Sequence, residues 1–316
     1  MYRAKTMEFI KCHGSGNDFI LIDTTASSAL QGVDWSAFAR VACDRSSGIG
    51  SDGVLLVVRH EDGVYGMDML NPDGTHAEMC GNGIRCVARL AAERGYLDSG
   101  VLRSGGRDYV ISVAEPIADG IPAFAVDIPI STYSADFAFF NAPERCVGQK
   151  IEALDDKLMF TALSLGNPHI VSAVETIDMH HLESLGERVK VLKNLLPNGV
   201  NVSLYECRTP RSIFVATYER GAGITLSCGT AMTASATAAA LLGRVDAGER
   251  IEVRNRGGRV FCTTTLTDGI VTRLEGNATF EWYGRLDFDG VTLNYEQLEV
   301  TGEGALWTSH VESLNR

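Results

Sequence analysis

The sequence predicts an α/β protein of the α+β type, built from two similar domains. Three observations support this fold class. The chain has 316 residues, more than a single hydrophobic core usually serves. Short strand-like runs alternate with helical patterns along its length. The order of turns, strands and helices in the first half recurs in the second, which indicates an internal duplication.

The first half opens with a hairpin pattern and ends with a helix that follows a cysteine. The expected strands span residues 9–12, 19–23, 54–59, 65–70, 109–114 and 124–130. Asp34 is a suitable cap for a helix that ends near Cys43. After Cys80, apolar residues recur at helical spacing as far as Gly95, where glycine favours helix termination. Cys80 is therefore expected at the start of a helix.

The second half repeats this arrangement. Its expected strands span residues 170–174, 201–206, 213–219, 251–253, 260–264, 270–274 and 279–282, and a helix is expected over about 178–189. An alanine-rich helical pattern follows Cys228 as the earlier helix follows Cys80. From the turn at Gly16 to Cys80 the distance is 64 residues, and from the turn at Gly166 to Cys228 it is 62. The similar spacing supports the duplication.

The repeat sets the expected domain boundaries. The first domain is predicted over residues 1–130, joined by part of the C-terminal tail, about 277–316, and the second domain over 131–276. Residues after about 288 have weaker patterning. We expect them to form an appended tail that lies on the first domain or is partly mobile.

The composition excludes several classes of partner and site. The net charge is -12 and the pI is about 5.1, whereas nucleic acid and anionic membranes need a basic surface, so a small molecule is the expected partner. The longest run of small apolar residues, 234–242, is too short to span a bilayer, and no signal-peptide pattern occurs, so a cytoplasmic location is expected. Eight cysteines without a Cys-x-x-Cys pair indicate free thiols rather than a disulfide scaffold or a metal site.

The two helix-start cysteines share a position that favours acid–base chemistry. Exposed N–H groups and the helix dipole stabilise a thiolate there, so we expect the pKa of each thiol to lie below its ordinary value. The N–H groups of Gly81 and Asn82, or of Gly229 and Thr230, are suited to hold a carboxylate. If the duplication brings both helices to one cleft, one thiolate removes an α-proton and the opposite thiol returns one to the other face. Such a site inverts an amino-acid centre without a cofactor or a metal.

A single cysteine in such a place is more often an inert, buried thiol. The matching pair reverses that expectation for Cys80 and Cys228. The pattern assigns the following thiols to the core: Cys12, Cys43, Cys86, Cys207 and Cys262. His13 and His169 follow corresponding turns of the two halves, so the repeat makes them candidates for the site.

Several motifs together resemble the diaminopimelate epimerase family, over about residues 7–285. They are His13-Gly-Ser-Gly-Asn-Asp-Phe, Gly48-Ile-Gly-Ser-Asp-Gly, Asn71-Pro-Asp-Gly, Cys80-Gly-Asn-Gly, Gly166-Asn-Pro-His, Pro197-Asn-Gly-Val-Asn-Val, Glu219-Arg-Gly-Ala-Gly, Cys228-Gly-Thr and Gly276-Asn-Ala-Thr-Phe. The resemblance implies two pseudo-symmetric domains, each a curled, mixed, largely antiparallel sheet around a central helix, with the site between them. It also implies a cofactor-independent isomerase and a homodimer.

The resemblance implies roles for individual residues. Cys80 and Cys228 would form the acid–base pair, supported by His169 and Glu219. The residues implied to bind the substrate are Asn17, Asn71, Gly81, Asn82, Asn167, Asn201, Glu219, Arg220, Gly229 and Thr230. An arginine suits a distal carboxylate because its planar fork pairs with both oxygens. The implied reaction converts LL-2,6-diaminopimelate to the meso form, in lysine and peptidoglycan precursor synthesis.

The sequence departs from the family pattern at two places. Ile224 stands where the family usually has glutamate, and Ala231-Met232 replaces the usual Gly-Ala. These changes keep open a paralogous racemase of another amino acid, such as histidine or lysine, that uses the same thiol pair. A proline-racemase-like enzyme would not need the asparagine set. A non-catalytic amino-acid-binding module would not need both cysteines.

Overall fold

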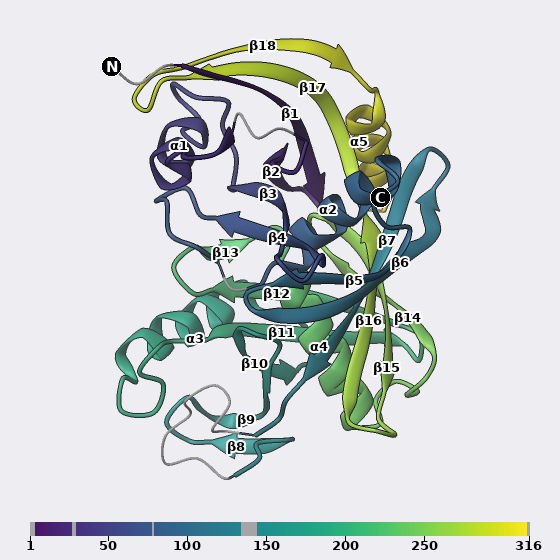
Figure 1. The fold of residues 1–316 in the computed structure, drawn as a ribbon. Coiled ribbons are helices and arrows are strands. Elements are labelled where there is room, and N and C mark those ends of the chain that lie inside the picture. Colours follow the sequence, from purple (N-terminus) through teal and green to yellow (C-terminus); the bar gives the residue numbers. More distant parts are fainter. Residues whose placement is uncertain (1–3, 27–29, 78, 134–143, 315–316) are drawn as a thin grey trace. The chain divides into compact units, whose positions relative to one another are not determined.

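The computed structural model describes residues 4–26, 30–77, 79–133 and 144–314 (Figure 1). Contacts divide the chain into two compact units. Unit 1 comprises Met1–Val126 and Gly276–Arg316, and unit 2 comprises Asp127–Glu275. Both units combine strands with helices, as the sequence predicts.

Unit 1 is built on a mixed sheet. In spatial order its strands are β18 (Leu293–Val300), β17 (Thr279–Phe288), β1 (Lys5–Gly14), β2 (Asn17–Asp23), β3 (Gly53–Arg59), β4 (Tyr65–Leu70), β5 (Ser99–Ser104) and β6 (Arg107–Ala118), and β7 (Ile121–Ile130) follows along the chain. The β2–β3 and β4–β5 pairs are parallel, and the other pairs in this series are antiparallel. Antiparallel pairing therefore dominates, with two parallel steps where helices cross over.

The two helices that interrupt this sheet begin after residues suited to capping. The Asp34 carboxylate accepts a hydrogen bond from the Ala37 N–H at 2.9 Å, and α1 (Trp35–Ala42) follows it. Helix α2 (Gly81–Glu93) begins directly after Cys80 and is buried along nearly its whole length. It contacts β1, β2, β3, β5 and β6, so it is the central helix of unit 1.

The tail after residue 288 forms a strand and a helix of unit 1. β18 pairs with β17, and α5 (Glu303–Leu314) follows (Figure 1). The Glu303 carboxylate accepts hydrogen bonds from both terminal nitrogens of Arg89 on α2, at 2.5 and 2.7 Å. The buried Trp307 ring lies 5.5 Å from the His13 ring. The weak sequence pattern reflects exposure, since β18 is exposed along nearly all of its length.

Unit 2 has its own mixed sheet. In spatial order its strands are β8 (Gln149–Ile151), β9 (Asp155–Ser164), β10 (Pro168–Ala173), β11 (Asn201–Thr209), β12 (Ser212–Glu219), β14 (Arg250–Asn255), β15 (Gly258–Thr265) and β16 (Ile270–Asn277), while β13 (Gly223–Thr225) also pairs with β12. The β10–β11 and β12–β14 pairs are parallel. Helix α3 (Met179–Val191) precedes β11, and the buried helix α4 (Gly229–Leu241) follows Cys228.

The two units share one topology. The series β1, β2, α1, β3, β4, α2, β5 and β6 corresponds to β9, β10, α3, β11, β12, α4, β14 and β15. Parallel pairs fall at the same two places in each series. A cysteine caps the corresponding helix of each unit. The two units therefore have the pseudo-symmetric topology that an internal duplication predicts.

Two details of the prediction are wrong. Cys207, expected in the core, is exposed because β11 extends beyond the core and its last three residues face solvent. Strands β5, β8, β9, β13 and β18 are missing from the prediction. Two of them, β8 and β13, have only three residues, too few to show a period.

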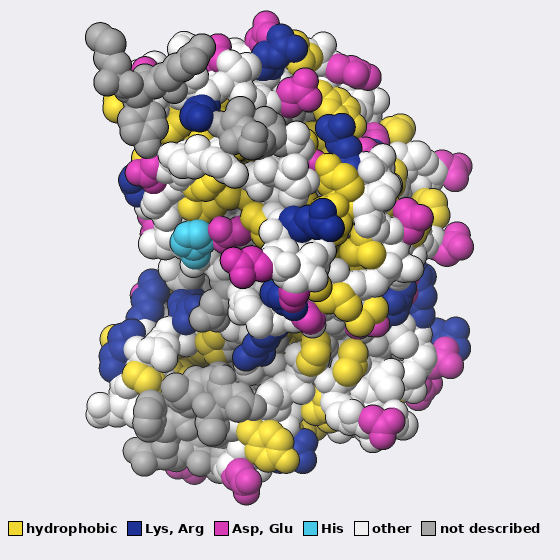
Figure 2. All heavy atoms as spheres, viewed as in Figure 1, with side chains coloured by type: hydrophobic (Ala, Val, Ile, Leu, Met, Phe, Trp, Pro, Cys, Tyr) yellow, Lys and Arg dark blue, Asp and Glu magenta, His cyan; other side chains and the backbone are white. Residues whose placement is uncertain are grey.

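The surface carries charges of both signs. Figure 2 shows acidic and basic side chains on the visible face, with apolar side chains among them. None of the helices in the described ranges has the length and apolar character needed to cross a membrane. Four exposed apolar residues of unit 1 belong to β18 and α5: Tyr295, Leu298, Val300 and Leu306.

Candidate active site

Cys80 is the N-cap of α2, at the end of a turn-rich segment. Its backbone is extended (φ -134°, ψ 109°), and its sulfur accepts a hydrogen bond from the Gly83 N–H at 3.3 Å. The thiol donates to Asn17 Oδ1 at 3.8 Å. Asn17 begins β2, so the turn between β1 and β2 brings this side chain to the start of the helix. Cys80 and Asn17, both predicted site residues, lie together in unit 1.

Asn82 belongs to the same group, and Asn71 does not. Asn82 Nδ2 donates to Asn17 Oδ1 at 3.3 Å. The Asn17 amide in turn donates to the Asp52 carboxylate at 2.7 Å. Asn71 Nδ2 instead donates to the Thr75 hydroxyl at 3.0 Å, within its own turn. The structure thus ties Asn82, but not Asn71, to the Cys80 thiol by hydrogen bonds.

Burial shifts the acidity of Cys80 in the direction opposite to the one expected from the sequence. The pKa of the thiol is raised to about 11, because removal from water disfavours the thiolate. Hydrogen bonds from the Gly83 and Asn82 N–H groups lower the pKa, and so does the positive charge of Arg85. The helix start therefore stabilises the thiolate as predicted, but burial outweighs it.

Cys228 has the corresponding place in unit 2. It is the N-cap of α4, with nearly the same backbone angles as Cys80 (φ -133°, ψ 110°). Its buried sulfur lies 3.5 Å from Thr230 Oγ1. Burial raises the pKa of the thiol well above its ordinary value, and the negative charge of Glu219 raises it further. The two thiols thus share backbone geometry but differ in the charge beside them.

The first turns of the two helices offer anion sites. Gly81 and Asn82 open α2, and Gly229 and Thr230 open α4; all four residues are buried. The first N–H groups of a helix have no partner inside it, and the helix dipole adds partial positive charge. Each of these helix starts is therefore suited to a carboxylate.

His169 connects several predicted site residues of unit 2. Its Nε2 lies 3.1 Å from both Asn167 Oδ1 and Thr230 Oγ1, and 3.5 Å from Asn201 Nδ2. Asn167 Nδ2 donates to Thr230 Oγ1 at 3.1 Å. Burial lowers the pKa of His169 to about 3, with a smaller contribution from Arg220. The imidazole is therefore neutral at pH 7 and is joined to Cys228 through Thr230.

Glu219 and Arg220 lie at the end of β12. The Arg220 N–H donates to Asn201 Oδ1 at 2.8 Å, while its exposed guanidinium donates to the Asn198 carbonyl at 3.0 Å. The Glu219 carboxylate accepts a hydrogen bond from the Thr225 hydroxyl. Asn201, Glu219 and Arg220 therefore lie together at one strand end of unit 2. Cys228 lies close enough to Glu219 for the negative charge to raise the pKa of the thiol.

The sequence comparison agrees with this arrangement. Residues 9–112 and 161–281 match the family model described as diaminopimelate epimerase, and each segment contains one cysteine-capped helix. The match covers more than half of the chain. The chain belongs to the diaminopimelate epimerase family. The membership predicted from the motifs is thereby confirmed.

Curated relatives in the family align with most of the chain. The diaminopimelate epimerase of Clostridium acetobutylicum is 36% identical over 287 residues, which cover 90% of this chain and 86% of the relative. That of Lactiplantibacillus plantarum is 37% identical over 292 residues, covering 87% of each. That of Ligilactobacillus salivarius is 34% identical and covers 98% of this chain and all of the relative.

Solved structures share the fold at low identity. A hydroxyproline epimerase from Agrobacterium vitis, with bound trans-4-hydroxy-L-proline, has a TM-score of 0.62 at 15% identity and covers 92% of this chain and 94% of its own. A phenazine biosynthesis protein of the PhzF family from Bacillus anthracis has a TM-score of 0.61 at 16% identity. The alignment covers 93% of this chain and 100% of that protein. This likeness shows the fold alone, and it confirms the predicted fold class.

The two departures from the family pattern have different surroundings. Ile224 is 40% exposed and lies on β13, opposite Tyr218 of β12. Ala231 and Met232 are buried in α4, and the Met232 sulfur accepts a hydrogen bond from Asn255 Nδ2 at 3.0 Å. The added bulk of Met232 is therefore accommodated in the core of unit 2.

Sequence reasoning missed two residues beside the Cys80 group. The fully buried Arg85 donates to Asn82 Oδ1 at 3.0 Å, and Asn277 Oδ1 accepts a hydrogen bond from the Ser15 N–H at 2.7 Å. The available signal for Arg85 was a charged residue in an otherwise apolar stretch of helix. Asn277 stands in the motif that begins at Gly276, but its partner Ser15 is remote in sequence, so the motif did not reveal the contact.

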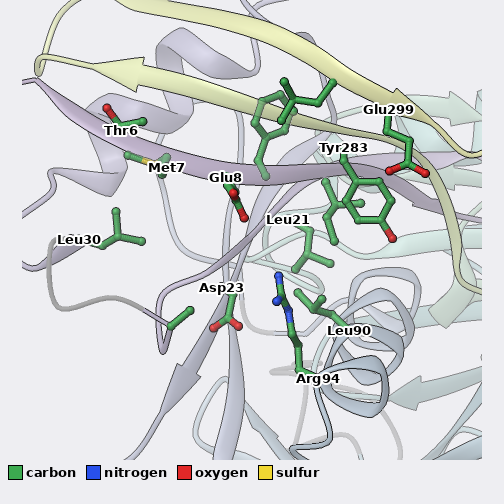
Figure 3. Close-up of a pocket in the computed structure, with 15 residues that line it drawn as sticks. Thr6, Met7, Glu8, Leu21, Asp23, Leu30, Leu90, Arg94, Tyr283 and Glu299 are labelled. Atoms are coloured by element: carbon green, nitrogen blue, oxygen red, sulfur yellow. The ribbon is translucent and has the colours of Figure 1, made fainter.

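A separate cavity of about 460 Å³ lies in unit 1, beside β1 and the end of α2 (Figure 3). Asp23, Arg94 and Tyr283 are polar residues of its lining, with Leu21 and Leu90 among the apolar ones. None of the predicted site residues lines it. It is therefore distinct from the Cys80 group.

Proposed function

We propose that this protein epimerises LL-2,6-diaminopimelate to meso-diaminopimelate, in lysine and peptidoglycan precursor synthesis. Relatives with this name, 34–37% identical over most of the chain, support the substrate. The observation that carries the chemistry is the pair of cysteine N-caps with matching backbone angles in two units of one topology. The enzyme is an isomerase, and proton transfer between two thiols and one carbon atom needs no cofactor.

In this reaction each thiol handles one proton. The thiolate of one cysteine removes the α-proton, and the electron pair of the broken C–H bond stays on the α-carbon. The thiol of the other cysteine donates its proton to the opposite face, where the same electron pair forms the new bond. Atoms and electrons balance without an oxidant or a reductant. The pair ends with its protonation states exchanged, so the reverse reaction uses the same two groups in opposite roles.

Backbone N–H groups hold the reacting carboxylate in this proposal. Those of Gly81, Asn82, Gly229 and Thr230 are buried at the starts of two helices. Negative charge grows on the carboxylate as the α-proton leaves. Groups that already point at that charge lower the barrier, because they need not reorganise during the reaction.

His169 and Glu219 have supporting roles. Neutral His169 orients Thr230, which contacts the Cys228 sulfur. The Glu219 charge raises the pKa of Cys228 and so favours the protonated thiol, the form that donates a proton. Both residues therefore act on the thiol rather than on the substrate carbon, although Glu219 also contributes to substrate binding.

The distal amino-acid end of the substrate needs polar partners. We infer that they come from Asn17, Asn71, Asn167, Asn201 and Arg220. The Arg220 guanidinium is exposed, and its fork suits the distal carboxylate. Asparagine amides serve either a carboxylate or an ammonium group. A substrate without a distal carboxylate would not use Arg220, and this is the basis for preferring diaminopimelate to lysine or histidine.

We also infer a homodimer in the cytoplasm. Exposed apolar side chains on the edge strand β18, such as Leu298 and Val300, favour burial against a second copy. All eight cysteines are free, which suits a reducing compartment.

The test is α-proton exchange in D2O, followed by NMR and chiral chromatography. The panel comprises LL-diaminopimelate, L-lysine, L-histidine, L-arginine and L-glutamate. We expect deuterium in diaminopimelate alone, together with meso product. Exchange of another amino acid with inert diaminopimelate would assign the same chemistry to a racemase of that amino acid. No exchange in any of the five would refute the proposal.

A further inference from the structure

We propose that Arg85 is a positioning residue for Cys80. Its buried guanidinium fixes the Asn82 amide and the turn after β1, and through them it fixes Asn17, the hydrogen-bond partner of the Cys80 thiol. The inference rests on the proposed function, because it concerns the same sulfur atom. Arg85 itself lies one turn along α2 from the cysteine and acts through other residues.

The guanidinium joins three segments that are far apart in the sequence. Its side chain is fully buried. Within α2 it donates to the Gly81 carbonyl at 2.8 Å and to Asn82 Oδ1 at 3.0 Å. It also donates to Ser15 Oγ and to the Asn277 carbonyl, each at 3.2 Å. One side chain thus ties the helix start to the β1–β2 turn and to the strand end at Asn277.

Gly14 and Gly276 leave room for the Arg85 guanidinium, and neither position has space for a side chain of its own. A Cβ on Gly276 would lie 2.8 Å from Arg85 Cζ, and one on Gly14 would lie 2.8 Å from the Asn82 carbonyl oxygen and 3.0 Å from Arg85 Nη2. Real Cβ atoms essentially never lie within 3.0 Å of another heavy atom, so the two separations of 2.8 Å exclude a side chain at either glycine unless its neighbours shift. The turn also contains Ser15 at φ 54°, the one described non-glycine residue with positive φ. Backbone on both sides therefore holds the guanidinium in place.

The contacts determine which way each amide points. Arginine has only donors, so the atom of Asn82 that it meets must be the oxygen. The Asn82 nitrogen then faces Asn17 and donates to its Oδ1 at 3.3 Å. The same Oδ1 is the acceptor for the Cys80 thiol. A chain of hydrogen bonds thus runs from Arg85 through Asn82 and Asn17 to the sulfur.

The corresponding position of unit 2 shows what Arg85 adds. Five residues after Cys228 stands Thr233, whose hydroxyl donates to the Gly229 carbonyl at 2.9 Å, as Arg85 does to Gly81. The first carbonyl of the helix therefore accepts a side-chain hydrogen bond in both units. Only in unit 1 is the donor, Arg85, charged. Arg85 lowers the pKa of Cys80 against the effect of burial. Cys80 is then the thiol that ionises more readily.

The experiment measures alkylation of each cysteine by iodoacetamide as a function of pH, with peptide mass spectrometry. In Arg85→Met we expect the Cys80 profile to move about one pH unit to the alkaline side and its alkylation at pH 8 to slow about tenfold, while Cys228 is unchanged. Arg85→Lys keeps the charge but not the fork, so a shift of about half as much is expected. Arg89→Met is the matched control, since Arg89 is also buried on α2 but pairs with Glu303.

An unchanged Cys80 profile in folded Arg85→Met, or an equal shift in Arg89→Met, would overturn the proposal. If Arg85→Met does not fold, Arg85→Lys decides, and a wild-type profile in that variant counts against the proposal. Alkylation requires no turnover. A protein that failed to exchange diaminopimelate would therefore still show whether Arg85 controls Cys80.

Discussion

The Thr225 hydroxyl donates a hydrogen bond to the Glu219 carboxylate, and the two oxygen atoms lie 2.5 Å apart. The short strand β13 makes this contact possible, because it pairs antiparallel with the end of β12 and places Thr225 opposite Thr217. Glu219 is the carboxylate that raises the pKa of Cys228. Thr225 therefore orients a group that sets the acidity of one of the two thiols.

Loss of this hydroxyl should slow the reaction. Thr225→Val is expected to lower kcat about tenfold, because a hydrogen bond to a charged group contributes about 1.5–3 kcal/mol. The rate of deuterium incorporation from D2O measures the effect. Thr225→Ser keeps the donor and should remain near the wild-type rate. Equal losses in both variants would show that the methyl group, rather than the hydrogen bond, matters.

Each helix-start thiol should be indispensable. Cys80→Ala and Cys228→Ala are each expected to lower kcat by about 10²–10⁴-fold, the usual contribution of a positioned acid or base. Cys86→Ala and Cys262→Ala, which remove buried thiols outside the helix starts, are the controls and should retain turnover. The two-thiol mechanism fails if either of the first two variants keeps wild-type exchange.

The reaction should accelerate toward alkaline pH. The free enzyme reacts with one thiolate and one thiol, and the pKa values of Cys80, at about 11, and of Cys228 are both raised. Below the lower of these values, the thiolate fraction grows with pH. We expect kcat/KM to rise about tenfold per pH unit between about pH 7 and 9. Initial rates in a constant-ionic-strength buffer series test this, and a flat profile would contradict it.

Acid should destabilise both units through buried histidines. The pKa of His13 is lowered from 6.5 to about 4, and that of His169 from 6.5 to about 3, chiefly by burial. Both folded-state values lie below that of the unfolded chain, so stability is complete above pH 6.5 and is lost as pH falls toward them. At pH 5 the expected loss is about 2 kcal/mol per histidine.

Urea unfolding at pH 7 and pH 5 checks this expectation. His169→Gln should reduce the difference between the two pH values, because it removes one of the titrating groups. The exposed His180 offers a matched control, and His180→Gln should leave the difference as it is. A pH dependence that survives both His13→Gln and His169→Gln would point to other groups.

Charge on β18 should dissociate the proposed dimer. Leu298→Asp and Val300→Asp would bury a carboxylate at the interface, so light scattering after gel filtration should give the monomer mass. Val191→Asp on α3 of unit 2, where the native valine is 76% exposed, is the control and should stay dimeric. A dimer that persists in the β18 variants would place the interface elsewhere.

Local pattern was sufficient to predict the helix starts. In each half, Cys-Gly is followed by small or apolar residues at helical spacing, and this pattern predicts a helix. Both helices are present, directly after Cys80 and Cys228. The repeat of this pattern at similar spacing predicted the pseudo-symmetric fold. Asp34 was likewise predictable as a cap, since its side chain bonds to a residue three positions on.

Features that depend on distant residues were not predictable. Arg85 meets Ser15 and Asn277, which lie 70 and 192 positions away, and nothing in the local pattern pairs them. The acidity of Cys80 was predicted with the wrong sign because burial is a property of the folded unit. Cys207 was assigned to the core because a free cysteine usually packs as a small hydrophobe. The point at which β11 leaves the core depends on the folded unit, and the local sequence does not show it.

Unit 1 is made from both ends of the chain. β1 pairs with β17, and Thr6 bonds to Asp287, 281 positions later. Unit 2 is contiguous. During synthesis on the ribosome, all the strands of unit 2 are therefore made before β17, the strand that pairs with β1. The half of the protein that is synthesised first is completed last, and until β17 emerges the open edge of β1 is a site where another nascent chain could pair.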